Sequence, residues 1–223
     1  MTRRSLFACL ALWALGGALA FPAEAATVIT GTVKNKAGQP LPGLALLEKG
    51  ELHNNVWARG ALVAADGHFR IKLPEGGQYG LHVYSSGYIY SPQAVKVENG
   101  KAQQVNVVLV PEPTRANDPV IKQVSFGSRG KGTLVKMDVT HPNNILGPQV
   151  LAFNAATGKS YAMTPPHPMK DLKANFPNGV YQLEVADSAS NPRKWYFVVA
   201  DHQCNTSDIL GFPHSPKEAK VIH

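Results

Sequence analysis

Apolar and polar side chains alternate along most of the sequence after residue 26, and this alternation is what most limits the fold. Over residues 68–73, Phe69, Ile71 and Leu73 alternate with polar side chains, and residues 79–83 repeat the pattern. Successive side chains of a β-strand point to opposite faces, so a period of two predicts strands with one buried face and one solvent-facing face. No segment after residue 26 has sustained helical periodicity. The chain is therefore predicted to be all-β.

Turn-forming residues separate the predicted strands. Asp66-Gly67, Asn99-Gly100 and the Pro-Asn-Gly sequence at 177–179 each lie between apolar segments. The chain contains 20 Gly and 17 Pro, and only 17% of its residues are charged. This composition is typical of many short strands joined by tight turns.

The segments 68–73 and 79–84 also predict a register if they pair as a hairpin. Matching their apolar faces places Leu73 opposite Tyr79, because a slip of one residue would turn one face inside out. The side chains that then face outward are His68, Arg70, His82 and Tyr84.

The first 25 residues have the pattern of a cleaved secretory signal peptide. Two arginines at positions 3 and 4 precede an uncharged apolar run over residues 6–21, and Ala23-Glu24-Ala25 has the small-x-small pattern of a signal-peptidase site. The run is shorter than the roughly 20 residues that span a bilayer. The mature protein is therefore expected to be periplasmic or secreted and to lack a membrane span.

Several short motifs occur in a fixed order between residues 27 and 111. In that order they resemble the carboxypeptidase regulatory-like domain, a transthyretin-like β-sandwich. The resemblance implies a Greek-key fold of seven or eight strands that accompanies other domains in carboxypeptidases, outer-membrane receptors and surface proteins, and it supplies no catalytic residues. The motifs occupy residues 31–33, 40–43, 66–71, 73–76, 79–81 and 86–88.

A second predicted unit follows a proline-punctuated linker at residues 112–119. Its alternating segments extend over residues 120–201, and residues 178–185 are similar to the penultimate strand of immunoglobulin-like domains. We therefore expect two consecutive Greek-key β-sandwiches, with residues 202–223 as a C-terminal tail. One continuous sandwich with unusual topology is the alternative.

The sequence contains none of the common catalytic motifs. There is no His-Glu-x-x-His, no Gly-x-Ser-x-Gly and no phosphate-binding loop, and the glycine-rich residues 127–132 are predicted to be a hairpin turn. Lys and Arg outnumber Asp and Glu by 22 to 15, but they are scattered rather than clustered as in a nucleic-acid binder. We expect a non-enzymatic protein with no cofactor and no nucleic-acid partner.

Aromatic side chains provide one candidate binding site. An insertion at residues 48–60 carries Trp57, which either contacts a ligand or folds back over an open end of the sandwich. Exposed aromatic rings beside polar groups are able to stack on sugars. The candidate binding residues are Trp57, His68, His82, Tyr84, Tyr88 and Tyr90.

Sulfur and imidazole groups of the second unit provide a speculative copper site, because soft ligands of this kind suit copper. Cys204 is also the only cysteine after residue 25, so it is buried, metal-bound, reactive or paired with another chain. An intermolecular disulfide through Cys204 is one hypothesis, and a shielded thiol is the other. The candidate copper ligands are Met163, His167, Met169, His202 and Cys204.

Three functional hypotheses follow. The first is a non-catalytic accessory or binding module for another envelope protein, as the family resemblance implies. The second is a carbohydrate-binding module, and the third is a periplasmic copper-binding protein.

Overall fold

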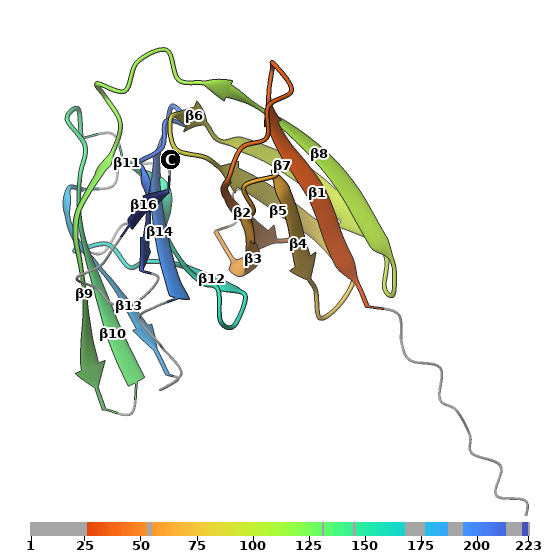
Figure 1. Ribbon diagram of the computed structural model, residues 1–223. Helices are drawn as coiled ribbons and strands as arrows, with labels where there is room; N and C mark the ends of the chain where they lie inside the picture. The colour runs from red at the N-terminus through yellow and green to blue at the C-terminus, as the bar shows by residue number, and fades with distance from the viewer. Residues whose placement is uncertain are drawn as a thin grey trace, which may run out of the picture.

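The computed structural model describes residues 26–52, 55–130, 132–144, 146–167, 177–186, 194–212 and 220–222 (Figure 1). The predicted signal peptide and Met169 lie outside these residues. The described part of the chain forms sixteen strands, which confirms the expected all-β fold. It contains no helix that is long and apolar enough to cross a membrane.

Residues 28–111 form two layers of sheet. In the outer layer β1 pairs antiparallel with β4 and parallel with β8, in the order β4-β1-β8-β6. The outer strands are β1 (Val28–Asn35), β4 (His68–Lys72), β6 (Tyr88–Ile89) and β8 (Ala102–Pro111). The inner layer has the order β3-β2-β5-β7. Its strands are β2 (Gly43–Lys49), β3 (Trp57–Val63), β5 (Gly77–Tyr84) and β7 (Ser91–Val97).

Residues 120–222 also contribute an outer and an inner layer. The outer sheet has the order β13-β10-β9, and the inner strands have the order β16-β15-β14-β11-β12. The outer strands are β9 (Val120–Arg129), β10 (Gly132–Thr140) and β13 (Gly179–Val185). The inner strands are β11 (Leu146–Asn154), β12 (Lys159–Ala162), β14 (Trp195–Asp201), β15 (Ile209–Phe212) and β16 (Lys220–Ile222).

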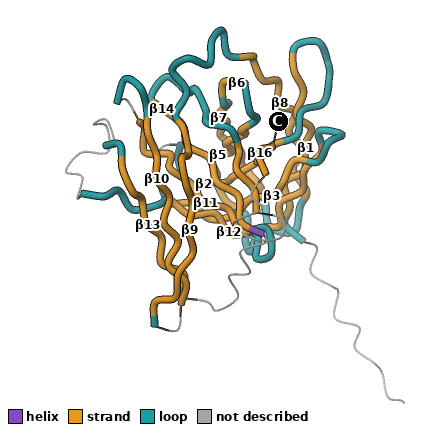
Figure 2. Tube along the Cα trace, turned by 60° about the vertical axis from the view of Figure 1, so that its left-hand side comes forward, coloured by secondary structure: helices purple, strands orange, loops and turns teal. Residues whose placement is uncertain are grey.

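The inner layers of the two units are joined into one nine-stranded sheet by the pairing of β12 with β3. At this joint Lys159 lies opposite Arg59, and the Gly60 N–H donates to the Gly158 carbonyl at 2.9 Å. Figure 1 shows the two outer sheets on opposite sides of the molecule, with the strands of the nine-stranded sheet between them. Figure 2 shows the same arrangement from another side, with long strands joined mostly by loops.

Each unit has an apolar core between its outer and inner layers. Phe69, Ile71 and Leu73 are buried in the first core, and Tyr181 and Trp195 are buried in the second. The polar residues that alternate with the first set along β4 are exposed. The predicted alternation of buried and exposed side chains on this strand is therefore confirmed.

A third apolar core lies between the two units. Leu44 and Leu46 of β2 pack there with Leu151 and Phe153 of β11, while Ala45, which lies between the two leucines in sequence, faces the first core. Strand β2 is thus buried on both faces. This explains why residues 44–47 are a continuous apolar run and not an alternating one.

The predicted hairpin between residues 68–73 and 79–84 is wrong. Strand β4 pairs with β1 in the outer layer, whereas β5 pairs with β2 and β7 in the inner layer. The expectation that His82 and Tyr84 face solvent is wrong for a related reason, since both side chains are fully buried. The second unit covers the face of β5 that an isolated sandwich would expose.

The shared core predicts that the two units unfold together. In the chain from Ala26 onward, Trp57 and Trp195 are the only tryptophans, and each reports on a different unit when the other is replaced by Phe. We expect both reporters to give the same urea transition. Leu46→Ala should lower the stability reported by both, by about 2–5 kcal/mol, because it leaves a cavity between the units.

Phe153→Ala is the reciprocal variant, made in the second unit. It should again shift both tryptophan transitions together. Independent units would instead respond separately, with Leu46→Ala lowering only the Trp57 transition and Phe153→Ala only the Trp195 transition.

Candidate functional site

A cleft with a volume of about 590 Å³ opens where the first unit meets a turn of the second. Its walls come from β3, from β4 and the residues that follow it, and from the turn between β11 and β12. Several of the wall residues are small, which leaves space for a ligand. The described lining residues are Arg59, Gly60, Ala61, Leu62, Arg70, Lys72, Leu73, Pro74, Phe153, Ala155, Ala156, Thr157 and Gly158.

The cations of this cleft come from two strands. Arg70 and Lys72 lie on the exposed face of β4, because the residues between them are buried in the first core. Arg59 comes from β3, and its Nη1 donates to the Thr157 carbonyl oxygen at 3.1 Å. This hydrogen bond fixes one nitrogen of the guanidinium and leaves its other donors available.

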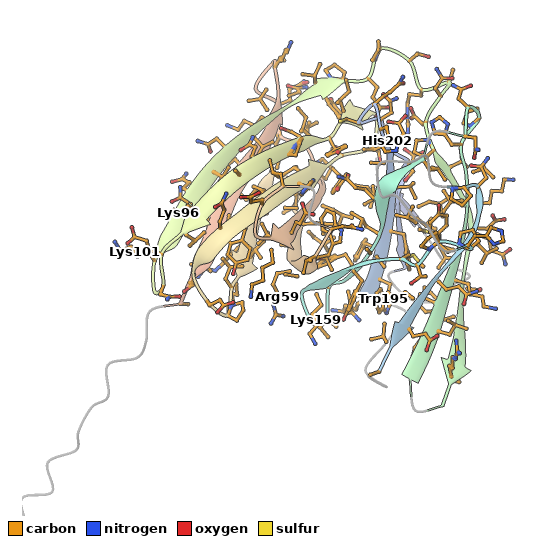
Figure 3. The ribbon with its side chains drawn as sticks, turned by 180° about the vertical axis from the view of Figure 1, so that it is seen from behind. Arg59, Lys96, Lys101, Lys159, Trp195 and His202 are labelled. Carbon is orange, nitrogen blue, oxygen red and sulfur yellow. The ribbon has the colours of Figure 1, made fainter. Side chains whose placement is uncertain are left out.

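Lys159 of β12 adds a fourth cation beside the cleft. It lies opposite Arg59 at the bridge that joins the two units, and Figure 3 shows the two side chains close together on the same part of the molecule. The Ser160 hydroxyl donates to the Arg59 carbonyl oxygen at 3.0 Å. Both strands are therefore held in place at this point.

No acidic residue is among the described residues that line the cleft. Within the same part of the chain, Arg59, Arg70, Lys72 and Lys159 form no ion pair. The basic side chains of Lys49, Lys101 and Arg129, in contrast, each contact a carboxylate. Positive charge is thus left unneutralised at the cleft, where it is able to attract an anion.

A second cavity, of about 330 Å³, lies beside the predicted linker. Arg115 lines it and is already engaged, since it donates to Asp118 at 2.8 Å and to Asp208 at 2.7 Å. The one cation among the described lining residues is thus already paired with both carboxylates of the lining. We therefore favour the first cleft as the ligand site.

The predicted linker contributes a buried pair of carboxyl groups. The Glu112 side chain is fully buried and that of Asp118 nearly so, and the Thr206 N–H donates to Glu112 Oε1 at 2.9 Å. Burial, the largest cause, and the neighbouring Asp118 carboxylate together raise the pKa of Glu112 to about 7 against the lowering effect of the Thr206 amide. Near neutral pH the Glu112 carboxyl group is therefore partly protonated.

The structure buries three of the six residues of the predicted aromatic site. His82, Tyr84 and Tyr90 are buried between the units, Trp57 and Tyr88 are half-buried, and His68 is exposed beside Asp66. A side chain covered in this way does not present a face to a sugar. The assignment of these residues to a ligand site stays a prediction without support from their positions.

Trp57 and the insertion fold back over the inner sheet. Glu48, with 1% of its surface exposed, contacts His82 at 3.1 Å and accepts a hydrogen bond from the Asn55 N–H. The Trp57 indole donates to Asn55 at 2.8 Å, and its ring lies 4.9 Å from the imidazole of His82. These contacts agree with the covering role for Trp57, and its contact with a ligand stays a prediction.

The inter-unit core also contains a chain of polar groups that the sequence does not reveal. The Tyr84 hydroxyl donates to Gln149 Oε1 at 2.9 Å, and Gln149 Nε2 donates to the Tyr90 hydroxyl at 2.9 Å. Elsewhere, His141 contacts the buried Asp201 at 3.3 Å. Each set consists of residues far apart in sequence, so no local motif signals them.

The residues predicted to bind copper are distributed over different parts of the second unit. Met163 is buried in that unit's own core, whereas Cys204 packs against the inter-unit core. His167 and His202 are exposed, and Met169 lies outside the described residues. Among the described residues no cluster of three or more His, Cys, Asp or Glu forms a metal site. The copper hypothesis therefore gains no support.

Residues 28–110 match the family of the carboxypeptidase regulatory-like domain. The resemblance expected from the sequence motifs is confirmed. The matched range contains β1 to β7 and nearly all of β8. Comparison with the curated proteins gives no match.

The solved structures to which this chain is similar are distant. A candidate carbohydrate-binding protein of Bacteroides uniformis is 12% identical, with 85% of this chain and 93% of that chain covered and a TM-score of 0.29. A DUF3823 family protein of Parabacteroides merdae is 14% identical, with 81% and 91% covered and a TM-score of 0.29. BcpA, the major pilin subunit of Bacillus cereus, is 9% identical, with 82% and 68% covered and a TM-score of 0.34. At these values none of them assigns a ligand.

The raised pKa of Glu112 predicts that stability depends on pH. The folded chain holds this proton up to about pH 7, while the unfolded chain releases it near the ordinary value of 4.5. The contribution of Glu112 to stability is complete below pH 4.5 and falls as pH rises to about 7. Glu112→Gln, which keeps a neutral hydrogen-bonding group, should be more stable than wild type at pH 7.5 and similar at pH 4.5.

Urea unfolding across this pH range measures the difference between the two proteins. Glu184→Gln is a matched control, because Glu184 is an exposed carboxylate in an ion pair with Arg129. A Glu112→Gln variant whose stability relative to wild type does not change between pH 4.5 and 7.5 would contradict the raised pKa of Glu112.

Cys204 is predicted to be a shielded thiol. Burial raises its pKa, which lowers the fraction of reactive thiolate. Iodoacetamide should therefore modify Cys204 more slowly in the folded protein than in urea. Wild type and Cys204→Ser should elute at the same volume from a sizing column under oxidising conditions, and a dimer present only in the wild type would show that the thiol pairs between chains.

Proposed function

We propose that this protein is an exported, non-catalytic binding module of the cell envelope that takes a saccharide-sized ligand into the cleft between its two units. The single observation that carries the proposal is the cleft itself, with a volume of about 590 Å³ and walls from both units. Pockets that hold small ligands have volumes of about 300–1,000 Å³.

The rigidity of the cleft walls supports the proposal. The cleft lies at the pairing of β3 with β12, where backbone hydrogen bonds and the inter-unit core hold the walls in place. A site that is already formed loses little conformational entropy when a ligand binds.

The location and the lack of catalysis are also part of the proposal. The apolar run and cleavage pattern of residues 1–25 support export. The family match of residues 28–110 supports a non-catalytic module.

An accessory role for another envelope protein stays the alternative. It rests on the family match, because domains of this family accompany others. The recessed shape of the cleft favours a small or narrow ligand over a folded partner, which usually buries a larger and flatter surface.

Blocking the cleft tests the proposal. Ala156 is exposed in the turn that forms one wall, so Ala156→Trp should fill the cleft without disturbing a core. Ser125→Trp is the matched control, since Ser125 is exposed on β9 of the outer sheet. Retention is measured by electrophoresis through gels that contain pectin, alginate or dextran.

We expect at least one polysaccharide to retard the wild type and Ser125→Trp but not Ala156→Trp. Equal retardation of all three proteins would show that the cleft is not the site. Peptide hydrolysis by the purified protein would overturn the non-catalytic assignment.

A further inference from the structure

Two cations face each other at the joint between the units. Lys159 and Arg59 are direct partners in the antiparallel bridge of β12 with β3. Directly opposed residues lie on the same face of a sheet with their Cβ atoms about 4.5–5.5 Å apart, and like charges in this position destabilise the pairing. The fold therefore carries an electrostatic cost at the strand pairing that joins the two units into one sheet.

The surroundings add to this positive charge instead of relieving it. Arg70 and Lys72 line the same cleft, and no acidic residue is among its described lining residues. None of these four cations has a carboxylate partner in the described ranges, although Glu75, Glu98 and Glu184 pair with cations elsewhere. An anion in the cleft would relieve the repulsion that the fold leaves in place.

We infer that the cleft binds an anionic glycan, whose carboxylate or sulfate groups are held by Arg59 with Lys159, Arg70 and Lys72. This inference rests on the proposed function and names its ligand class. Arg59 is the central contact, because its bond to the Thr157 carbonyl holds the guanidinium in position. A guanidinium fixed in this way is able to bind a carboxylate or sulfate through two parallel hydrogen bonds.

The lining favours an anionic glycan over other ligands. Phe153 is the one aromatic residue among the described lining residues, and only 2% of its surface is exposed. Single-stranded nucleic acids rely on exposed aromatic rings for stacking, and the cleft does not offer one. Its volume of about 590 Å³ also exceeds what a single inorganic anion would fill.

A pair of charge variants tests the inference. Lys159→Gln removes one of the opposed charges, and Lys136→Gln, an exposed lysine on β10, changes the net charge equally at a distance from the cleft. Binding of oligogalacturonate and of sulfated dextran oligosaccharides is measured by calorimetry at low and at high salt. Maltohexaose is the neutral probe, and hexaglutamate is the acidic peptide probe.

Lys159→Gln should weaken binding of the anionic oligosaccharides by about tenfold and at the same time raise the melting temperature at low salt. A merely structural lysine would not produce opposite effects on binding and stability. Lys136→Gln should change neither the binding of the oligosaccharides nor the melting temperature. Added salt should weaken binding by the wild type.

Each of the remaining outcomes of these binding measurements would overturn one part of the proposal. Binding of maltohexaose that Ala156→Trp abolishes would preserve the proposed function and overturn the anionic ligand class. Hexaglutamate binding as tightly as oligogalacturonate would overturn the assignment to a glycan. Binding of anionic oligosaccharides that Ala156→Trp leaves unchanged would overturn both the inference and the cleft as the site.

Discussion

The apolar core between the two units is the interaction on which the rest of the structure depends. Without it, the faces of β2 and β5 that carry Leu44, Leu46 and Tyr84 would be exposed to water. Full burial of a large apolar side chain contributes about 1.5–3 kcal/mol, so several such residues outweigh the short strand pairing at Lys159 and Arg59. The core, more than the bridge, holds the units together, and the cleft takes its shape from that arrangement.

The sequence correctly predicts which side chains are buried on strands that have only one buried face. On β4 the alternation of Phe69 and Ile71 with polar residues identifies the buried side correctly, because water covers the other face. The motifs around Asp66-Gly67 also lead to the correct family. Both signals are local, since strand period and turn chemistry depend only on neighbouring residues.

The prediction of burial from the sequence fails where the second unit covers side chains that the first sandwich alone would expose. The alternation at residues 79–84 is real, but Tyr84 is buried against residues more than 60 positions away, among them Gln149, which accepts a hydrogen bond from the Tyr84 hydroxyl at 2.9 Å. His82 is buried against Glu48 and Trp57 of the insertion. The cleft cannot be predicted from the sequence, because its residues come from distant parts of the chain. Arg59 and Lys159 are 100 residues apart, and neither lies in a charge cluster that would attract attention.

The opposed charges of Arg59 and Lys159 are explained by the cleft beside the pairing of β3 with β12, and not by the stability of the fold. A surface lysine is easily replaced, and two cations facing each other across a bridge offer the fold no stability. The buried polar residues Glu48 and Gln149 have by contrast structural roles, since Glu48 accepts a hydrogen bond from the insertion and Gln149 joins two tyrosines. Because Arg59 belongs to one unit and Thr157 to the other, the ligand proposed for the cleft would contact both, and its binding free energy would add to the stability of their junction.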